Sequence, residues 1–397
     1  MSAAARAQQA GRPSINFSAD VSPLIKAISW ASTGAMDRTS IPILNNILVQ
    51  AAGGKLLVVG ADMDREVEVE IDAKVGIEGA TTMPLRTFGD LVRGYPAGGE
   101  VEVGLGPRDS RAAVSCGRSR SMLPTLDADQ FPRIRVAGSE RLASFDLDTD
   151  TLERMIDKVA FVAGEETGKP HLLGMHIHTV DTEDGRKLRA VATDGYQLAV
   201  AEADAPEGLD FAAGVTLAAK TVSCLRKLTQ AGGEMTTIQV TQSLIEFNLR
   251  QVRMTSKVIG YAYADYNRFY PEKYGPTVIV DKALMTAALD RALLFATTTN
   301  RRLKLDLEPG VIKTTARTYT TGELDDEITV DYDGEPFTVV FNAKRLKDII
   351  THIDDPRVEI AFTTGKTVFR IRGEGSKSEH YLMQPIPDGQ VEVADDK

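Results

Sequence analysis

Three histidines lie close together in the sequence and are the first candidates for chemistry. They are His171, His176 and His178, and the last two would share one face of a β-strand, which is a spacing that metal sites use. No cysteine, aspartate or glutamate stands in the same short run to complete a ligand shell. The pattern therefore favours histidines that face solvent or pack against neighbours. A metal-dependent enzyme that uses His176 and His178 stays as an alternative.

The second candidate is a pair of arginines, Arg118 and Arg120, within the sequence SCGRSRSMLPTL. In one unbroken strand they would lie on the same face as Val114 and Cys116, which would bury two guanidinium groups beside apolar side chains. Because that is costly, we expect Gly117 to mark a strand end or a bulge that leaves both arginines exposed. Exposed arginines can bind an anionic partner or pair with acids across a domain interface.

The remaining polar motifs do not indicate catalysis. Cys116 and Cys224 are far apart and neither stands beside a second cysteine or a histidine pair, so we expect reduced thiols. Because no triad or paired-carboxylate site is evident, we expect no catalytic residue, no metal and no cofactor. No apolar stretch approaches the roughly 18 residues of a membrane span, and we expect a cytoplasmic protein.

Similar elements recur three times along the 397 residues, which determines the architecture before any site is considered. Segments with helical apolar spacing follow a possible aspartate N-cap at Asp20, Asp148 and Asp281. A second helical segment follows each of them, beginning at Pro84, Ala218 and Asn342. Segments with period-2 alternation lie between and after the helices and predict antiparallel strands. The sequence thus predicts an α+β fold of three repeated domains, each with two helices packed on antiparallel sheets, at residues 14–136, 143–272 and 276–390, with flexible tails at 1–13 and 391–397.

Charge is distributed unevenly over these elements. The chain has a formal net charge of −10, whereas the helical segments together are net positive, so the acidic excess lies elsewhere. In the predicted strand VEVEID, Glu66, Glu68, Glu70 and Asp72 alternate with apolar residues, and we expect a solvated acidic face there. Helices that share one positive surface would suit a polyanion. The first helix of the second domain carries several acids and does not fit this pattern.

Several local sequences resemble the bacterial sliding clamps, the beta subunits of DNA polymerase III. SCGRSRSMLPTLDADQFP resembles the end of the family's first domain, ATDGYQLAV an element of its second, and FNAKRLKDII the start of the last helix of its third. The resemblance runs from about residue 14 to 387. It implies a non-catalytic processivity factor in which two chains form a closed ring, with helices lining a hole for double-stranded DNA. It also implies tethering of the replicative polymerase, the clamp loader and other partners through short clamp-binding peptides.

The resemblance also implies three sets of functional residues. The basic places that face DNA match Arg38, Arg118, Arg120, Lys220 and Lys304. The apolar groove for partner peptides matches Leu172, Thr193, Gly195, Leu198, Ala264, Phe269, Leu382, Gln384, Pro385 and Ile386. The dimer interface matches Ser121 and Leu123 on one side and Leu294 and Phe295 on the other.

Some of these residues depart from the family's pattern. Ala264 and Gln384 replace a usual proline and methionine in the groove, and the chain continues past the family's usual end. Ser121 replaces a usual aromatic residue at the dimer interface. We expect a generic clamp-binding peptide to bind weakly. The resemblance leaves open whether the chain is the main replicative clamp or an accessory, mobile-element copy that serves repair.

Overall fold

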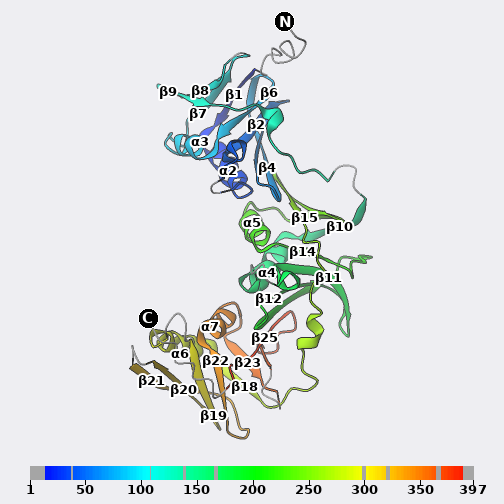
Figure 1. Ribbon diagram of the computed structural model, residues 1–397, viewed down its shortest axis with the longest axis vertical. Helices are drawn as coiled ribbons and strands as arrows, with labels where there is room; N and C mark the ends of the chain where they lie inside the picture. Colours follow the sequence, from blue (N-terminus) through cyan, green and yellow to red (C-terminus); the bar gives the residue numbers. More distant parts are fainter. Residues whose placement is uncertain are drawn as a thin grey trace. The chain divides into compact units, whose positions relative to one another are not determined.

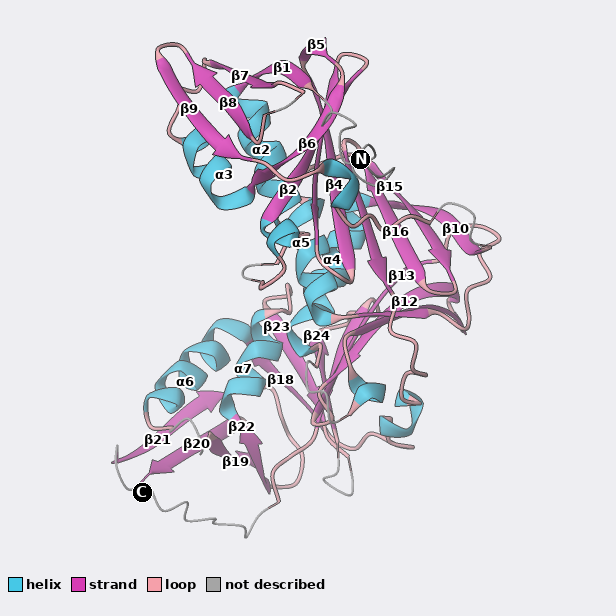
Figure 2. Cartoon of the chain, turned by 45° about the horizontal axis from the view of Figure 1, so that its top comes forward, coloured by secondary structure: helices cyan, strands magenta, loops and turns pink. Residues whose placement is uncertain are grey.

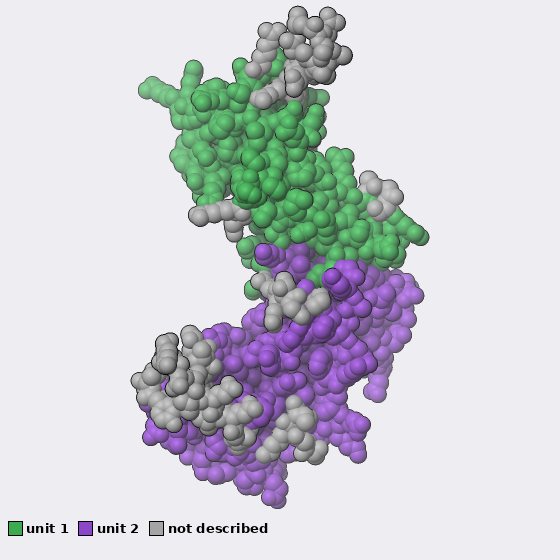
Figure 3. Space-filling model, in the orientation of Figure 1, with its two compact units in different colours: residues 1–153, 223–259 green, residues 154–222, 260–397 purple. Residues whose placement is uncertain are grey.

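The computed structural model describes residues 14–36, 39–107, 109–136, 140–164, 169–296, 301–318, 322–363 and 368–387 (Figure 1). The predicted tails, 1–13 and 391–397, and residues 388–390 lie outside these ranges. The chain divides into two compact units, residues 1–153 with 223–259 and residues 154–222 with 260–397, and each is described by itself (Figure 3). Among the described residues, no helix combines the length and the apolar character needed to cross a membrane.

Each repeat begins with a strand and a helix, continues with further strands and a second helix, and ends with three strands. The two helices and the strands between and after them are as the sequence predicts. The first repeat contains β1 Ile15–Asp20, α2 Val21–Ser32, β2 Asn46–Ala52, β3 Lys55–Ala61, β4 Arg65–Asp72, β5 Lys74–Ile77, β6 Gly79–Pro84, α3 Leu85–Arg93, β7 Glu100–Leu105, β8 Arg111–Cys116 and β9 Ser119–Pro124. The second contains β10 Arg141–Asp148, α4 Thr149–Val159, β11 Met175–Thr182, β12 Gly185–Thr193, β13 Gln197–Asp204, β14 Val215–Leu217, α5 Ala219–Thr229, β15 Met235–Thr241, β16 Leu244–Leu249 and β17 Val252–Lys257. The third contains β18 Thr277–Asp281, α6 Lys282–Leu294, β19 Arg302–Glu308, β20 Val311–Thr318, β21 Gly322–Thr329, β22 Phe337–Asn342, α7 Ala343–Thr351, β23 Arg357–Ala361, β24 Phe369–Gly373 and β25 Glu379–Met383.

The helices begin where the aspartate signals predict. Asp148 Oδ1 accepts a hydrogen bond from the Thr151 backbone N–H at 2.8 Å, and Asp281 Oδ1 accepts one from the Leu284 N–H at 2.9 Å. Asp20 occupies the N-cap position of α2 without a side-chain bond. Side-chain acceptors at the N-cap satisfy backbone donors that the first helical turn leaves unpaired, which explains two of the three starts.

Two eight-stranded sheets join neighbouring repeats, one within each unit. In the first sheet the order is β10-β15-β16-β17-β4-β3-β2-β6, and the last strand of the second repeat, β17, pairs antiparallel with β4 of the first. In the second sheet the order is β14-β11-β12-β13-β25-β24-β23-β18, and β25 of the third repeat pairs antiparallel with β13 of the second. Each junction therefore joins the third strand after the first helix of one repeat to the final strand of the next.

Two smaller sheets contain the remaining strands. Their orders are β5-β1-β7-β8-β9 and β21-β20-β19-β22. Within the described part of the chain, β9 pairs only with β8 and β21 only with β20, so both are edge strands. Figure 2 shows α6 and α7 side by side over the four-stranded sheet, and these helices contact each other and that sheet.

The prediction of a solvated acidic face on β4 is wrong for the first half of the strand. Glu66 and Glu68 are buried, with 1% and 5% of their surface exposed, whereas Glu70 and Asp72 are exposed. Arg133 Nε donates to Glu66 Oε2 at 3.0 Å, and Arg133 and Arg253 both donate to Glu68. Burial raises the pKa of Glu66, although Arg133 acts in the opposite direction. Alternation predicted the strand correctly but could not reveal that basic side chains cover its second face.

Candidate functional site

The histidines of the second repeat belong to a hydrogen-bonded aromatic network. His176 Nδ1 lies 3.0 Å from Thr216 Oγ1, and its ring stacks on Tyr263 with centroids 5.0 Å apart. His178 Nε2 lies 2.7 Å from the Tyr266 hydroxyl. Burial lowers the pKa of His176 to about 4 and also lowers that of His178.

These contacts do not favour the metal alternative. Both imidazole rings have protein partners, and His171 is exposed on the short turn Pro170–Leu172. Within the described ranges, no group of three or more His, Cys, Asp or Glu side chains is placed to hold a metal ion. His176 and His178 therefore act as packed polar residues beside Tyr263 and Tyr266.

The predicted groove residues come together on the second sheet. β12, β13 and β25 place Thr193, Leu198 and Leu382 next to one another, since Thr193 pairs with Leu198 and Leu198 with Leu382. Val191, Leu198, Val200, Tyr266 and Leu382 form a buried apolar cluster, and Phe269 packs against it. A shallow pocket over this cluster is lined by Thr193, Gly195, Tyr196, Gln197, Leu198, Phe269, Val368, Leu382, Met383 and Gln384.

The pocket is small. Its volume is about 10 Å³, which is space for one water molecule at most. Gly195 has φ +88°, and a Cβ there would lie 3.3 Å from Leu172 Cδ1, so this position suits glycine and places Leu172 at the pocket edge. Tyr196, Gln197, Val368 and Met383 were not in the predicted set. Their positions at the pocket depend on the pairing of β13 with β25, which no local signal reveals.

The remaining groove residues are Ala264, in the segment after β17, and residues 384–386, which follow β25. The Ala264 backbone N–H donates to the His171 carbonyl at 2.9 Å, and the Gln384 N–H donates to the Tyr196 carbonyl at 2.9 Å. Ile386 is held by its backbone N–H, which donates to the Val340 carbonyl at 2.7 Å, and Pro385 lies between these two residues. Gln384 is exposed, so it presents an amide at a place where the resemblance expects a thioether.

The predicted DNA-facing residues differ in their surroundings. Arg118 lies in the two-residue turn between β8 and β9, where Gly117 has φ +58°, and Arg120 lies on the edge strand β9. The strand therefore ends at Cys116 as predicted, and both arginines are exposed. Lys220 is exposed in the first turn of α5.

The two remaining predicted DNA-facing residues are Lys304 and Arg38. Lys304 lies on β19, and its Nζ is 2.8 Å from Asp306 Oδ2. Burial acts to raise the pKa of Asp306, but hydrogen bonds from Lys304 and Thr338 lower it overall. Part of the charge of Lys304 is thus neutralised by a neighbour. Arg38 lies outside the described residues.

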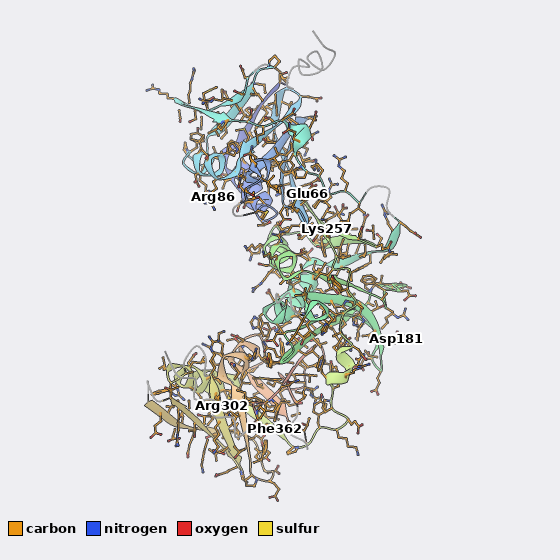
Figure 4. All side chains as sticks on the ribbon, in the orientation of Figure 1. Glu66, Arg86, Asp181, Lys257, Arg302 and Phe362 are labelled. Atoms are coloured by element: carbon orange, nitrogen blue, oxygen red, sulfur yellow. The ribbon has the colours of Figure 1, made fainter. Side chains whose placement is uncertain are left out.

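The helices of the first repeat present basic residues that sequence reasoning missed. A hollow of about 610 Å³ lies along α2 and α3, and Arg86 and Arg93 line it. Figure 4 labels Arg86. Arg86 is exposed in the first turn of α3 and Arg93 in its last turn. Both lie in PLRTFGDLVRGYP, one of the helical segments that together are net positive. The sequence analysis did not predict a role for either arginine.

The predicted interface residues differ in exposure. Leu294 has 73% of its surface exposed at the end of α6, and Phe295 follows it half-buried. On β9, Ser121 is half-buried and Leu123 is only 6% exposed, whereas Met122 is 56% exposed. Met122 shares the outer face of β9 with Arg120, because successive strand residues alternate in direction.

Three α+β repeats that share sheets at their junctions, with a groove on the second shared sheet, define a clamp-type fold. The chain matches the family models described as the DNA polymerase III beta subunit N-terminal domain over residues 15–135, central domain over 146–265, and C-terminal domain over 267–387. The chain belongs to this family, the DNA sliding clamps that act as processivity factors.

Individual relatives support the same conclusion. The beta sliding clamp of Caulobacter vibrioides is 36% identical over 91% of this chain and 97% of its own length, and that of Escherichia coli K12 is 28% identical over 94% and 100%. A solved Caulobacter crescentus clamp superposes with a TM-score of 0.90 at 35% identity, covering 95% of this chain and 100% of the other. The clamp of Bartonella birtlesii bound to griselimycin gives 0.90 at 27% identity, covering 94% and 100%.

Proposed function

We propose that two copies of this chain close into a ring around duplex DNA and act as a non-catalytic, cytoplasmic subunit that tethers a polymerase. We retain the predicted domain bounds 14–136, 143–272 and 276–390. The observation that carries the proposal is the repeated junction between strands. β4 pairs with β17 of the next repeat, and β13 pairs with β25 of the next repeat.

The same pairing between repeats can occur once more only if a second copy of the chain supplies the partner strand. In the third repeat, β21 is the third strand after the first helix, as β4 and β13 are in their repeats. In the first repeat, β9 is the final strand, as β17 and β25 are in theirs. Both are edge strands among the described residues. Pairing of β21 with β9 of another chain would join the four-stranded sheet of one copy to the five-stranded sheet of the other, and two such junctions would close a dimer.

Charge and apolar surface support this pairing. β21 carries Glu323, Asp325, Asp326 and Glu327, whereas Arg120 lies on β9 and Arg118 in the turn before it. Within the chain, Arg317 already pairs with Glu323 and Asp325, and Arg291 with Asp326. Opposite charges across paired strands stabilise a sheet. Met122 and Leu294 supply exposed apolar surface to be buried at the junction. This favours a role in ring closure for Arg120, which the resemblance assigned to DNA, and leaves Arg118 in the adjoining turn available to either.

DNA would be held by weak, sequence-independent contacts from exposed basic side chains. Lys220 on α5 and Arg86 on α3 are the described candidates on helices, and Arg38, Arg118 and Lys304 remain predicted contacts. Phosphate contacts from Lys and Arg carry no base information, as a sliding ring requires. The pocket over Leu198 and Leu382 would receive apolar anchors of partner peptides, from the polymerase, the clamp loader and other proteins.

Retention on circular DNA tests this function. A ring that is loaded onto a nicked circle by a clamp loader should stay bound at a salt concentration that removes it from linear duplex, and should leave when the circle is cut. The mass in solution should be twice the 43.0 kDa of one chain. A chain that is monomeric at micromolar concentration and leaves circles as fast as linear DNA would contradict the proposal.

A further inference from the structure

The part of the pocket wall that contains Phe269 is one short helical turn with a tyrosine at each end. The turn is Tyr266–Phe269, and Tyr270 is its C-cap. Tyr266 is only 5% exposed and belongs to the apolar cluster under the pocket, and Phe269 and Tyr270 pack against the same cluster. Both tyrosine rings are thus in contact with the side chains that form the floor of the pocket.

Each of the two tyrosine hydroxyls bonds to a histidine of the second sheet. The Tyr266 hydroxyl lies 2.7 Å from Nε2 of His178 on β11, and the Tyr270 hydroxyl lies 2.5 Å from Nε2 of His380 on β25. In the sheet, β12 and β13 lie between these two strands. The turn is therefore tied to the sheet on both sides of the strands that contain Thr193 and Leu198.

The Tyr266 hydroxyl acts as a donor and as an acceptor. His178 Nδ1 lies 2.9 Å from the Thr179 carbonyl, so the ring N–H is at Nδ1. Burial lowers the pKa of His178, so the ring is neutral at neutral pH and its Nε2 accepts the Tyr266 hydroxyl. The Tyr266 oxygen in turn accepts from Arg189 Nη1 at 3.1 Å, and Arg189 Nε donates to Glu202 Oε1 at 2.6 Å.

These directional bonds fix the turn in a way that apolar packing does not. The hydrophobic effect is non-directional, so the cluster under the pocket does not by itself stop the turn from sliding over the sheet. The hydrogen bonds, at 2.5–3.1 Å, weaken steeply when their geometry changes. Because Phe269 lines a pocket of only about 10 Å³, its position decides how far an apolar side chain can enter.

We propose that Tyr266 and Tyr270, through His178 and His380, are positioning residues that hold Phe269 in place before a partner peptide binds. The proposal rests on the proposed function of the groove, and it concerns the geometry of the wall rather than the sequence of the peptide. His178, first considered as a metal ligand, thereby has a role at the groove. A wall that is fixed before binding lowers the cost of ordering it in the complex, so loss of a hydroxyl weakens binding and speeds release.

A double-mutant cycle on the full-length chain tests the proposal with a peptide of eight residues that has two leucine anchors. Tyr266→Phe removes one hydroxyl, keeps the ring, and should raise the peptide Kd about tenfold, mostly through faster dissociation in surface plasmon resonance. Phe269→Ala removes the wall side chain itself and should also weaken binding. In a chain that already has Phe269→Ala, the further change Tyr266→Phe should alter the Kd less than about twofold, because no ring remains to be positioned. Independent effects that multiply in the double variant would overturn the proposal.

Two kinds of control separate positioning from a general loss of packing. His178→Gln keeps a side-chain oxygen that can accept the Tyr266 hydroxyl and should bind the peptide within about threefold of the unchanged chain, whereas His178→Leu should weaken binding as Tyr266→Phe does. Tyr274→Phe is the matched control. Tyr274 follows the turn, and its hydroxyl has no hydrogen-bond partner in the described part of the chain, so this variant should keep the Kd. An equal loss of affinity in Tyr274→Phe would overturn the proposal.

Other outcomes separate this proposal from the function of the groove. If Tyr266→Phe lowers the melting temperature but binds the peptide as the unchanged chain does, the hydroxyl is only structural, and the groove remains a peptide site. If the unchanged chain does not bind the peptide at all, the groove and the positioning role are refuted together. Should Tyr266→Phe fail to fold, Tyr270→Phe takes its place in the cycle, because the same result is expected at the other end of the turn.

Discussion

Replacement of Leu294 by alanine should loosen the proposed ring without unfolding the chain. Because 73% of Leu294 is exposed, it adds little to the core of its own domain. Full burial of a leucine is worth about 1.5–3 kcal/mol, so burial of the exposed part at a junction is worth about 1–2 kcal/mol. A ring of two chains has two such junctions. The substitution should therefore cost about 2–4 kcal/mol per ring and raise the dimer Kd by roughly 30- to 1000-fold.

A dilution series in the analytical ultracentrifuge measures this shift. Leu284→Ala is the control, because Leu284 lies in the first turn of the same helix and is 52% exposed. It should leave the dimer Kd unchanged. Thermal unfolding of both variants should match that of the unchanged chain, since surface substitutions usually alter stability by less than about 0.5 kcal/mol.

The neighbouring Phe295 gives a second measurement of the same junction. It is half-buried, and its Cε1 lies 3.9 Å from the position of a Cβ added at Gly322, at the start of β21. Phe295→Ala should therefore also shift the chain toward a folded monomer, as the resemblance suggested. If the Leu294→Ala and Phe295→Ala dimers dissociate at the same concentration as the unchanged dimer, this end of α6 lies outside the interface and the reasoning is refuted.

Three further predictions concern DNA, the groove and pH. Lys220→Ala should weaken duplex binding equally for all sequences and reduce the slope of log K against log salt by about 0.9, measured by fluorescence anisotropy; an unchanged slope would remove Lys220 from the DNA contacts. The unchanged chain should bind a generic clamp-binding peptide at about micromolar level, and Gln384→Met should tighten binding several-fold by calorimetry; nanomolar binding by the unchanged chain would show that Gln384 does not matter. The pKa of His176 is about 4 in the folded chain against 6.5 for an unperturbed histidine, so below pH 6.5 the unfolded chain takes up the proton first. This histidine should therefore lower the free energy of unfolding by up to about 3 kcal/mol as pH falls from 6.5 to 4, and have no effect above pH 6.5. His176→Gln should remove part of that fall in urea titrations, and parallel pH curves for the two proteins would contradict the assignment.

The helices and the repeat could be predicted from the sequence because their signals are local. An aspartate followed by apolar residues at spacings of three and four defines a helix start, as at Asp148 and Asp281. The turn at Gly117 could also be predicted from the sequence, because two arginines cannot be buried beside Val114 without a partner. Glu66 and Glu68 show the limit, since their partners Arg133 and Arg253 lie far away in sequence.

The groove could be predicted only through the family resemblance. No local pattern places Leu198 beside Leu382, because the pairing of β13 with β25 joins segments of different repeats. The resemblance supplied those positions but not the contacts of Tyr266 and Tyr270. Their partners His178 and His380 are 88 and 110 residues away in sequence, and these side chains become neighbours only in the folded second unit.

In the proposed ring, the opposite charges of the two edge strands would also set the direction of assembly. An exposed strand edge can pair with any other exposed edge, which is how folded proteins begin to aggregate. Two β9 edges would bring Arg118 and Arg120 of both copies together, and two β21 edges would do the same for their carboxylates. Because like charges on adjacent strands repel, the charges favour β9 against β21 over either symmetric pairing. The charges that would stabilise the contact between β9 and β21 would thus also reduce self-association of separated chains through like edges.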